Sequence, residues 1–431
     1  MAPRPAMEES HRGFQSVILP GPFVRLTTAL AVFLLAPWSA PASNATPLGS
    51  SLGPSCHGVQ VAPGDDLQGL IDTHRRRSTF CFAPGMYQLS GTVWTGNKFP
   101  RLDLRAGAVL DGNSGSFESF NGLEAPRDRP GMIVLGGVFQ HFVSALSLNR
   151  NAVVKGTEFR ENFGVGLGIS GDNARVSNVH THHNGQYGLT VTIPCVGCPA
   201  PKGVIIEDSE IAFNNTRHLD PGDNAGGTKF SAGTNGMIVR RNEVHDNYGM
   251  GLWWDGSNKN ARVYGNRIYD NRNAGILYEI SFGGTRIHHN KLIDNGSGDG
   301  SADWTLNVQL GVASSDGSRG GRGGIEIYAN RIDGAAYPLG IVTHAGRPTT
   351  KQVHVHDNLL ILRAASSRVG GADQTGTGEM FRRSAGNRFQ ANTYRVLDPK
   401  AAYWAWNGER LTWAQWHALG HDDNGVVERV K

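Results

Sequence analysis

One short motif, Asn-x-x-x-Gly followed by Leu or Ile, recurs along the middle of this chain at nearly constant spacing. Full copies begin at positions 162, 184, 247 and 271, and an asparagine also stands at the matching places 214 and 295. The intervals are therefore 22, 30, 33, 24 and 24 residues, which gives a base period of 22 to 24 residues with two insertions. A unit of this length cannot bury a core by itself and must stack on its neighbours.

Within each unit, short alternating stretches such as Ala261–Tyr264 and Arg267–Tyr269 have the period of a strand. The Leu-x-x-Leu-x-Leu pattern of leucine-rich repeats and the patterning of helical repeats do not occur. The 58 glycines follow no collagen period and indicate many tight turns. We therefore predict an all-β chain, a single-stranded parallel β-helix (a solenoid) with a cap at each end.

The repeated asparagines are expected to be structural rather than ligand-binding. In stacked parallel coils, an asparagine at each turn can form a hydrogen bond with its equivalent in the next coil, and asparagine tolerates the left-handed backbone of sharp corners. For the caps, Asp65 is the candidate N-cap of a short helix. Residues 403–419, rich in tryptophan, are expected to cover the other end of the solenoid.

The first residues have the order of a secretory signal. Basic residues precede the apolar stretch Leu26–Leu35, and Ala40–Ala42 has the small-x-small form of a cleavage site. We predict a secreted, extracellular protein, attached to the cell surface if the signal stays uncleaved, with no membrane span after processing. The predicted division is 1–42 signal peptide, 43–130 N-terminal cap and first coils, 131–395 β-helix and 396–431 C-terminal cap.

Four cysteines follow the signal, and an even number in an exported chain favours disulfides. Cys56 with Cys81 would tie down the N-terminal segment, and Cys195 with Cys198 would close a loop tip. A zinc site would need about four ligands, and no second Cys-x-x-Cys pair exists. A redox motif would be followed by a helix N-terminus rather than by Pro-Ala-Pro.

Strand alternation predicts which side chains point outward. In Leu252–Asp255, the outward residues are the second and the fourth, and the same rule applies to the neighbouring coils. Two outward columns follow from this alignment: Gly168, Thr190, Lys229, Trp253 and Leu277, and beside it Ser170, Thr192, Ser231, Asp255 and Glu279.

These columns could carry chemistry. Adjacent coils lie about 4.8 Å apart, so Asp255 and Glu279 are expected to be direct neighbours. Like charges this close raise a pKa or recruit a cation, and Lys229 could act as the counter-ion. The alternative to a chemical role is that Asp255 and Glu279 belong to a solvated column of charged side chains. Trp253 could likewise stack on a sugar ring or pack beneath a loop.

Two insertions are expected to flank this face and to form a groove. Residues 215–227 carry His218, Asp220 and Asp223, and residues 296–323 carry Arg319. With Thr190 and Trp253 on the sheet, Arg319 is a candidate substrate-binding residue.

The repeats resemble those of right-handed parallel β-helix proteins of the pectate lyase-like superfamily, over roughly residues 131–394. Asp220–Phe230, followed by His245–Trp253, is similar to a stretch of family-nine polysaccharide lyases, where an acidic loop and an acidic cluster hold calcium. The resemblance implies a Ca²⁺ site, for which Asp220, Asp223, Asp255 and Glu279 are the candidate ligands in this chain. This chain departs from the family by having Gly249 and Met250 where consecutive aspartates are expected, so only Asp220 or Asp223 maps directly.

Three functions remain open. A lyase or C5-epimerase acting on a uronic-acid polymer would use Lys229 or Ca²⁺ to neutralise the substrate carboxylate, and Lys229 or His218 as base. A glycoside hydrolase would use Asp255 and Glu279 as paired carboxylates. A non-catalytic surface protein would only bind glycans. A net charge of +4 without Lys/Arg-rich runs suits an acidic polysaccharide rather than nucleic acid, and we expect a monomer.

Overall fold

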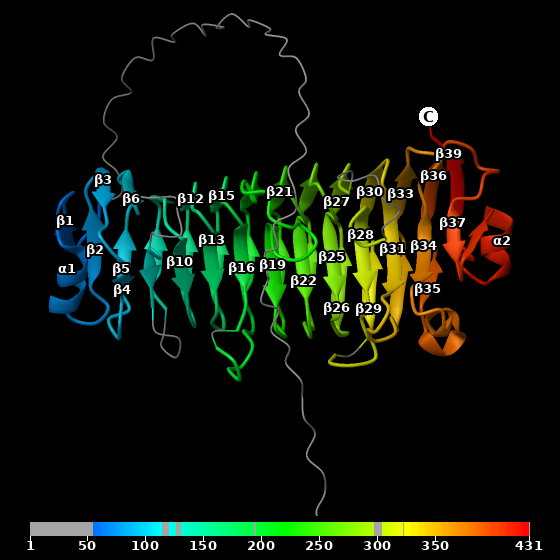
Figure 1. Ribbon diagram of the computed structural model, residues 1–431, viewed down its shortest axis with the longest axis horizontal. Helices are drawn as coiled ribbons and strands as arrows, with labels where there is room; N and C mark the ends of the chain where they lie inside the picture. The colour runs from blue at the N-terminus through cyan, green and yellow to red at the C-terminus, as the bar shows by residue number, and fades with distance from the viewer. Residues whose placement is uncertain are drawn as a thin grey trace, which may run out of the picture. The chain divides into compact units, whose positions relative to one another are not determined.

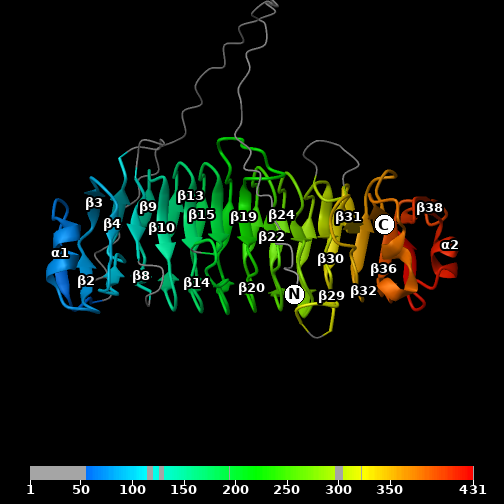
Figure 2. The same ribbon diagram turned by 60° about the horizontal axis from the view of Figure 1, so that its bottom comes forward.

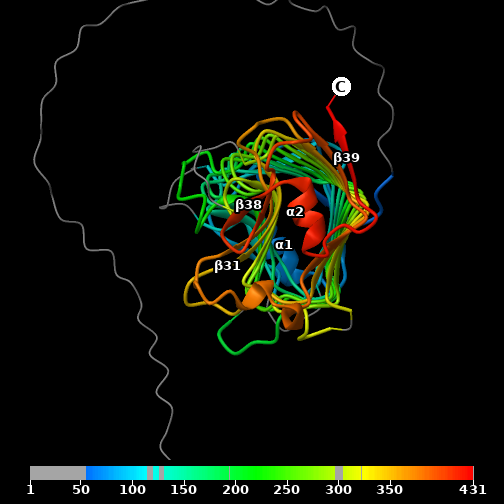
Figure 3. The ribbon, with the colours of Figure 1, turned by 90° about the vertical axis from the view of Figure 1, so that its right-hand side faces the viewer.

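The computed structural model describes residues 55–113, 120–125, 131–193, 195–296, 304–321 and 323–430. Within the unit Leu52–Lys431, the chain winds into coils that stack along one axis, and each full coil contributes one strand to each of three sheets (Figures 1 and 3). Each sheet has 13 strands, and the pairing is parallel except between the last two strands of sheet C. The predicted β-helix is confirmed.

Sheet A consists of β1 Val59–Val61, β2 Thr79–Phe82, β5 Arg101–Asp103, β8 Ile133–Leu135, β11 Val153–Lys155, β14 Arg175–Ser177, β17 Ile205–Glu207, β20 Ile238–Arg240, β23 Arg262–Tyr264, β26 Thr285–His288, β29 Ile325–Tyr328, β32 Val353–His356 and β35 Arg388–Gln390. Sheet B consists of β3 Gly85–Gln88, β6 Ala108–Asp111, β9 Val138–Gln140, β12 Glu158–Arg160, β15 His180–His182, β18 Glu210–Ala212, β21 Glu243–His245, β24 Arg267–Tyr269, β27 Lys291–Ile293, β30 Arg331–Gly334, β33 Leu359–Leu362, β36 Thr393–Val396 and β39 Val426–Arg429. Sheet C consists of β4 Val93–Trp94, β7 Leu123–Glu124, β10 Ser144–Leu148, β13 Val165–Ile169, β16 Tyr187–Val191, β19 Gly226–Ser231, β22 Leu252–Asp255, β25 Ile276–Glu279, β28 Val308–Ala313, β31 Tyr337–Thr343, β34 Val369–Asp373, β37 Trp404–Trp406 and β38 Glu409–Leu411.

Buried asparagines join the coils in two ladders, as the repeat predicts. In the first, the side-chain amide of Asn247 donates to Oδ1 of Asn271 at 2.8 Å, and Asn271 donates to Asn295 at 2.8 Å. The second ladder runs through Asn242, Asn266, Asn290, Asn330, Asn358 and Asn392. Since each amide both accepts and donates, the ladders satisfy buried polar groups and fix which residues lie above one another.

The glycine of the motif has a steric reason. A Cβ atom on Gly188 would lie 2.6 Å from Nδ2 of Asn214 in the next coil. Any larger residue would therefore push against the ladder.

The solenoid interior is filled by aliphatic and aromatic side chains from the inward positions of all three sheets. Helix α1, Leu67–Thr73, lies at the N-terminal end, and α2, Trp413–Ala418, lies at the other end, where Trp404 and Trp416 are fully buried (Figures 1 and 2). The 3₁₀ turns η1, Glu379–Phe381, and η2, Arg383–Ala385, precede β35. The predicted N-cap is displaced by one residue, because Asp66 accepts from the backbone N–H of Gly69 while Asp65 accepts from Ala62.

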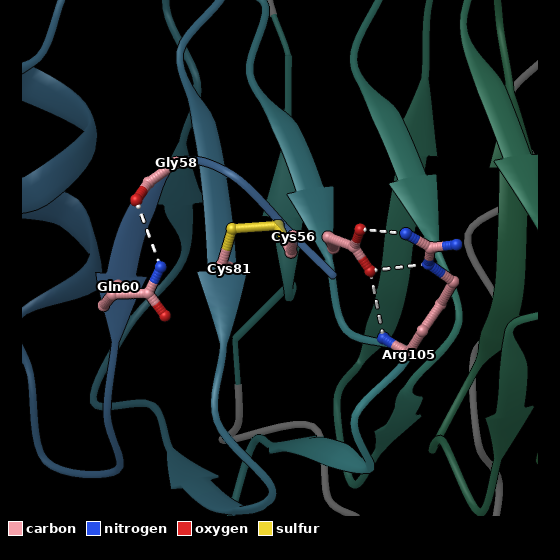
Figure 4. The surroundings of a disulfide bond; sticks show 6 residues. Cys56, Gly58, Gln60, Cys81 and Arg105 are labelled. Atoms are coloured by element: carbon pink, nitrogen blue, oxygen red, sulfur yellow. Dashed lines mark hydrogen bonds and ion pairs between the residues drawn. A yellow bond between two sulfur atoms is a disulfide. The ribbon is translucent and has the colours of Figure 1, made fainter. Parts of the chain in front are cut away.

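Both predicted disulfides are present. Cys56 is bonded to Cys81 in β2 beside the first strand (Figure 4), and Cys195 is bonded to Cys198 in the loop after β16. The first bond ties the segment before β1 to the second coil.

The predicted signal segment, residues 1–42, lies outside the described residues. Among the residues that the structure describes, no helix is long and apolar enough to cross a membrane.

Candidate functional site

The outward face of sheet C has the register that strand alternation predicts. Thr190 pairs with Lys229, Ser231 with Asp255, and Asp255 with Glu279. The acidic pair therefore lies on adjacent strands, one coil apart, with Lys229 beside it.

The ammonium group of Lys229 is held by three groups from different segments. Its Nζ atom lies 3.1 Å from Oδ2 of Asp255, donates to the carbonyl oxygen of Asp223 at 2.7 Å, and lies 3.8 Å from the ring centre of Trp253. The side chain is 19% exposed. An ion pair, a carbonyl and a cation–π contact thus fix one positive charge at a partly solvated position.

Glu279 occupies a less polar environment. Its Oε2 atom accepts from the indole N–H of Trp253 at 3.1 Å, and its Oε1 atom lies 3.9 Å from Nε2 of His344. Burial raises the pKa of Glu279, and the charge of Asp255 raises it further, against the opposing effects of Trp253 and Lys229. The raised pKa makes Glu279 a better proton acceptor than an ordinary carboxylate.

Trp253 points outward, as predicted, but it does not offer an open stacking surface. Its side chain is only 3% exposed, because Lys229 lies over its ring and apolar residues surround it. Those neighbours form a second hydrophobic cluster, on the outer side of sheet C, made of Met250, Trp253, Ala274, Leu277, Val308, Ala313 and Val342, with Trp304, Leu306 and Tyr337 packed against it. Of the two alternatives for Trp253, stacking on a sugar ring and packing beneath a loop, its burial favours the second.

The two insertions meet above this face. A Cβ atom on Gly222 of the first insertion would lie 3.6 Å from Cδ2 of Leu306 in the second, and one on Gly340 would lie 2.8 Å from Cε3 of Trp304. The predicted second insertion, 296–323, is not a loop throughout, because Val308–Ala313 forms β28 of sheet C. Trp304 and Leu306, just before β28, lie against the sheet, while the first insertion supplies the Asp223 carbonyl that holds Lys229.

The acidic side chains predicted to bind calcium do not converge. Asp220 accepts from the backbone N–H of Gly222, and Asp223 accepts from the side-chain amide of Asn224, so both carboxylates are turned toward their own loop. Asp255 is neutralised by Lys229. Among the described residues, no three His, Cys, Asp or Glu side chains form a group that could hold a metal ion. The residues as placed do not fit the calcium site that the resemblance implies.

Three other predicted site residues, His218, Arg319 and Thr190, lie outside the group formed by Lys229, Trp253, Asp255 and Glu279. His218 is exposed and stacks on Tyr248 at a centroid distance of 4.1 Å. Arg319 is exposed over the ring of Phe282, 5.0 Å from its centre, at the corner that follows β25. Thr190 is half-buried next to Lys229.

Tyr187, which is not among the predicted site residues, lies on β16, next to the strand that carries Lys229. Its side chain is 5% exposed, and its hydroxyl is buried without a hydrogen-bond partner in the described part of the chain. Burial raises its pKa, and the charges of Asp223 and Asp255 add to this effect, so the phenol stays protonated. The signal was available: the motif glycine Gly188 faces the ladder, so the residue before it must face outward.

A cavity of about 460 Å³ adjoins the first insertion. It is lined by Val143, Ser144, Phe163, Gly164, Gln186, Arg217, Leu219, Asp220 and Asn224. The guanidinium of Arg217 lies 3.9 Å from the ring centre of Phe163, and Gln186 donates to the carbonyl of Asn224. The cavity therefore has an aromatic wall at Phe163, a cation at Arg217 and a carboxylate at Asp220. Gln186, the residue before Tyr187, also lines it.

Comparison with known proteins supports the fold. Residues 144–332 match the family described as a right handed beta helix region, and no curated protein sequence matches the chain. The A-module of mannuronan C-5 epimerase AlgE6 from Azotobacter vinelandii is 16% identical with a TM-score of 0.50, over 82% of this chain and 91% of that one. Alginate lyase from Paenibacillus sp. str. FPU-7 is 13% identical with a TM-score of 0.40, over 78% and 93%. Pectate lyase Pel9A is 13% identical with a TM-score of 0.37, over 83% and 81%. The family match and the likeness to the AlgE6 module identify the chain as a right-handed parallel β-helix protein.

Proposed function

We propose that the protein acts on an acidic, uronic-acid-containing polysaccharide, and that it removes the C5 proton of the sugar as a lyase or a C5-epimerase. The observation that carries this proposal is the fixed ammonium of Lys229 beside Glu279, a carboxyl group with a raised pKa. Carbohydrate-active proteins with related folds act on such polymers, as the names of the AlgE6 module and of the alginate lyase state.

The difficult step is to remove a proton next to a carboxylate, and it becomes easier when the charge of that carboxylate is neutralised. An ammonium group has three donors. Lys229 uses two of them on Asp255 and the Asp223 carbonyl, which leaves capacity for a substrate oxygen. In this proposal Lys229 performs the neutralisation, and no step uses calcium.

Glu279, whose pKa is raised by burial, is the proposed base and takes the C5 proton. In a lyase, the electron pair of the broken C–H bond forms the C4=C5 double bond, the C4–O bond breaks, and the leaving oxygen receives a proton from water. In an epimerase, a proton from water returns to C5 from the opposite side and the chain stays intact.

A specific observation also favours a second candidate, a glycoside hydrolase. Asp255 and Glu279 are paired in register, and their surroundings differ, since Lys229 neutralises the first while burial raises the pKa of the second. Paired carboxyl groups with different environments are the usual machinery of glycosidases.

The proposal includes export from the cell. Two disulfides support it, because such bonds persist in oxidising compartments.

The test is to incubate the protein with polygalacturonate and with alginate in heavy water, with and without chelator. Unsaturated, ultraviolet-absorbing ends would support a lyase, and deuterium at C5 in uncleaved polymer would support an epimerase. New reducing ends without unsaturation would replace the proposal with the hydrolase. Lys229→Met should abolish turnover, whereas Lys155→Met, at an exposed lysine of sheet A, should preserve it. Binding without any turnover would contradict both enzymatic candidates.

A further inference from the structure

A second hollow lies on sheet B, near the C-terminal end of the solenoid, at strands β30, β33, β36 and β39 (Figure 1, yellow to red). Its volume is about 800 Å³. It is lined by Arg331, Ile361, Arg363, Arg395, Glu428, Arg429 and Val430, and we call it the arginine hollow.

Its arginines outnumber the carboxylates they contact. Arg363 binds Asp333 through two parallel hydrogen bonds of 2.5 and 2.9 Å, and Arg331 shares the same carboxylate at 3.2 Å. Arg395 pairs with Glu428 at 3.1 Å, and Arg429 donates to the backbone carbonyl of Leu397. Three of the four guanidinium groups therefore share two carboxylates and the fourth binds a backbone carbonyl, so the lining keeps a positive excess, which Asp294 near Arg363 reduces.

The guanidinium groups are open to solvent. The side chains of Arg331, Arg363 and Arg395 are 42%, 50% and 43% exposed, whereas Asp333 is 9% exposed. The buried carboxylate of Asp333 binds the guanidinium groups of Arg331 and Arg363, so both side chains are held in place while they stay exposed to solvent. Ile361, 3% exposed, forms an apolar floor between them.

Three basic residues continue from the hollow along the same sheet. Arg267, Lys291 and Arg331 occupy the same outward position on three successive strands, and Arg267 also pairs with Glu243. Their spacing is that of adjacent coils, about 4.8 Å. A row of cations at regular intervals is complementary to a linear polymer with repeated anionic groups rather than to a single small ion.

We propose that the arginine hollow and this row bind a chain of carboxylate-bearing sugars, at a site separate from the Lys229 cluster. The planar fork of arginine matches a carboxylate in a bidentate manner, and its weak hydration lowers the cost of contact. The hollow lies on sheet B, whereas Lys229 lies on sheet C, so one face would hold the polymer while the other processes it. Only the sugar identity in this inference rests on the proposed function.

The test measures affinity for polygalacturonate by calorimetry at two salt concentrations, using the full chain. In the double variant Arg395→Gln/Arg429→Gln, affinity should fall about tenfold and its salt dependence should weaken, because charge-assisted hydrogen bonds are lost. Glu428→Gln should tighten binding, since it removes a competing carboxylate. The Arg286 variant, Arg175→Gln/Arg286→Gln, at two exposed arginines of sheet A, removes the same two charges elsewhere and should leave affinity unchanged.

Equal losses in the Arg286 variant and in the double variant would overturn the proposal, because binding would then follow net charge alone. Tight binding of neutral dextran, or a preference for DNA over the polyuronate, would also overturn it. Dextran sulfate separates the anionic sources: binding to it alone would replace carboxylate with sulfate and refute the proposal. In a Lys229→Met background, the double variant should lose the same factor of affinity, because the two sites are separate. Thus, binding by the unaltered protein without any turnover sinks the proposed function only, and turnover on short oligosaccharides with no loss of affinity in the double variant sinks this inference only.

Discussion

The indole N–H of Trp253 donates to Oε2 of Glu279 at 3.1 Å across two adjacent coils. The same ring carries the ammonium of Lys229 on its face at 3.8 Å. The buried indole of Trp253 therefore contacts both the Lys229 ammonium and the Glu279 carboxyl group of the candidate site. We infer that it positions these two groups.

Replacing this tryptophan by phenylalanine should separate these roles. Trp253→Phe keeps an aromatic ring below Lys229 but removes the hydrogen bond that lowers the pKa of Glu279, so that pKa should rise further. The acidic limb of the pH–activity profile should move upward, and the free energy of unfolding should fall by about 1 kcal/mol. Denaturant unfolding and a pH profile check the two effects. An unmoved profile would show that the indole does not influence Glu279.

The raised pKa of Glu279 also predicts how stability depends on pH. The unfolded chain ionises this carboxyl at its ordinary pKa, whereas the folded chain retains the proton to higher pH. Its contribution to stability therefore falls as pH rises from the ordinary pKa through the raised one. Glu279→Gln should increase the free energy of unfolding at neutral pH relative to pH 4, and the exposed control Glu409→Gln should not. Urea unfolding at both pH values decides this.

The asparagine ladder should be sensitive to loss of a single rung. Asn271→Ala removes the Oδ1 acceptor of both the backbone N–H and the side-chain amide of Asn247, and it removes the side-chain donor of Asn295 Oδ1, which keeps only the backbone N–H of residue 271. The expected loss is roughly 3 kcal/mol of unfolding free energy. Asn97→Ala, at an exposed asparagine, is the matched control and should change little. Equal stability of the two variants would mean that the ladder adds no net free energy.

The motif glycine offers a second test of the same packing. Gly188→Ala places a methyl group 2.6 Å from Nδ2 of Asn214, and overpacking of this kind costs about 1 to 3 kcal/mol. Gly91→Ala meets no atom within 4 Å and should be tolerated. The comparison requires only the melting temperatures of the two variants, and a smaller loss at Gly188 than at Gly91 would contradict the steric explanation.

The sequence allowed the register of the site to be predicted, because the spacing of Asn247 and Asn271 fixes that of Asp255 and Glu279. It did not allow the burial of Trp253 to be predicted. That burial comes from Trp304 and Leu306, which lie in an insertion outside the repeat and therefore have no position that the period can assign. His344 follows β31, two coils beyond the strand of Glu279. The spacing between neighbouring coils does not predict a contact over two coils.

The ladder has a consequence for how such a molecule changes in length. Each asparagine of the ladder bonds only to those of the adjacent coils. A whole repeat unit duplicated in the gene would therefore join the stack without changing the strand register on either side. A fragment of a unit, in contrast, keeps the alignment only where it leaves the stack as a loop, as in the intervals of 30 and 33 residues. The solenoid can therefore lengthen by complete coils while its outward columns of side chains stay aligned.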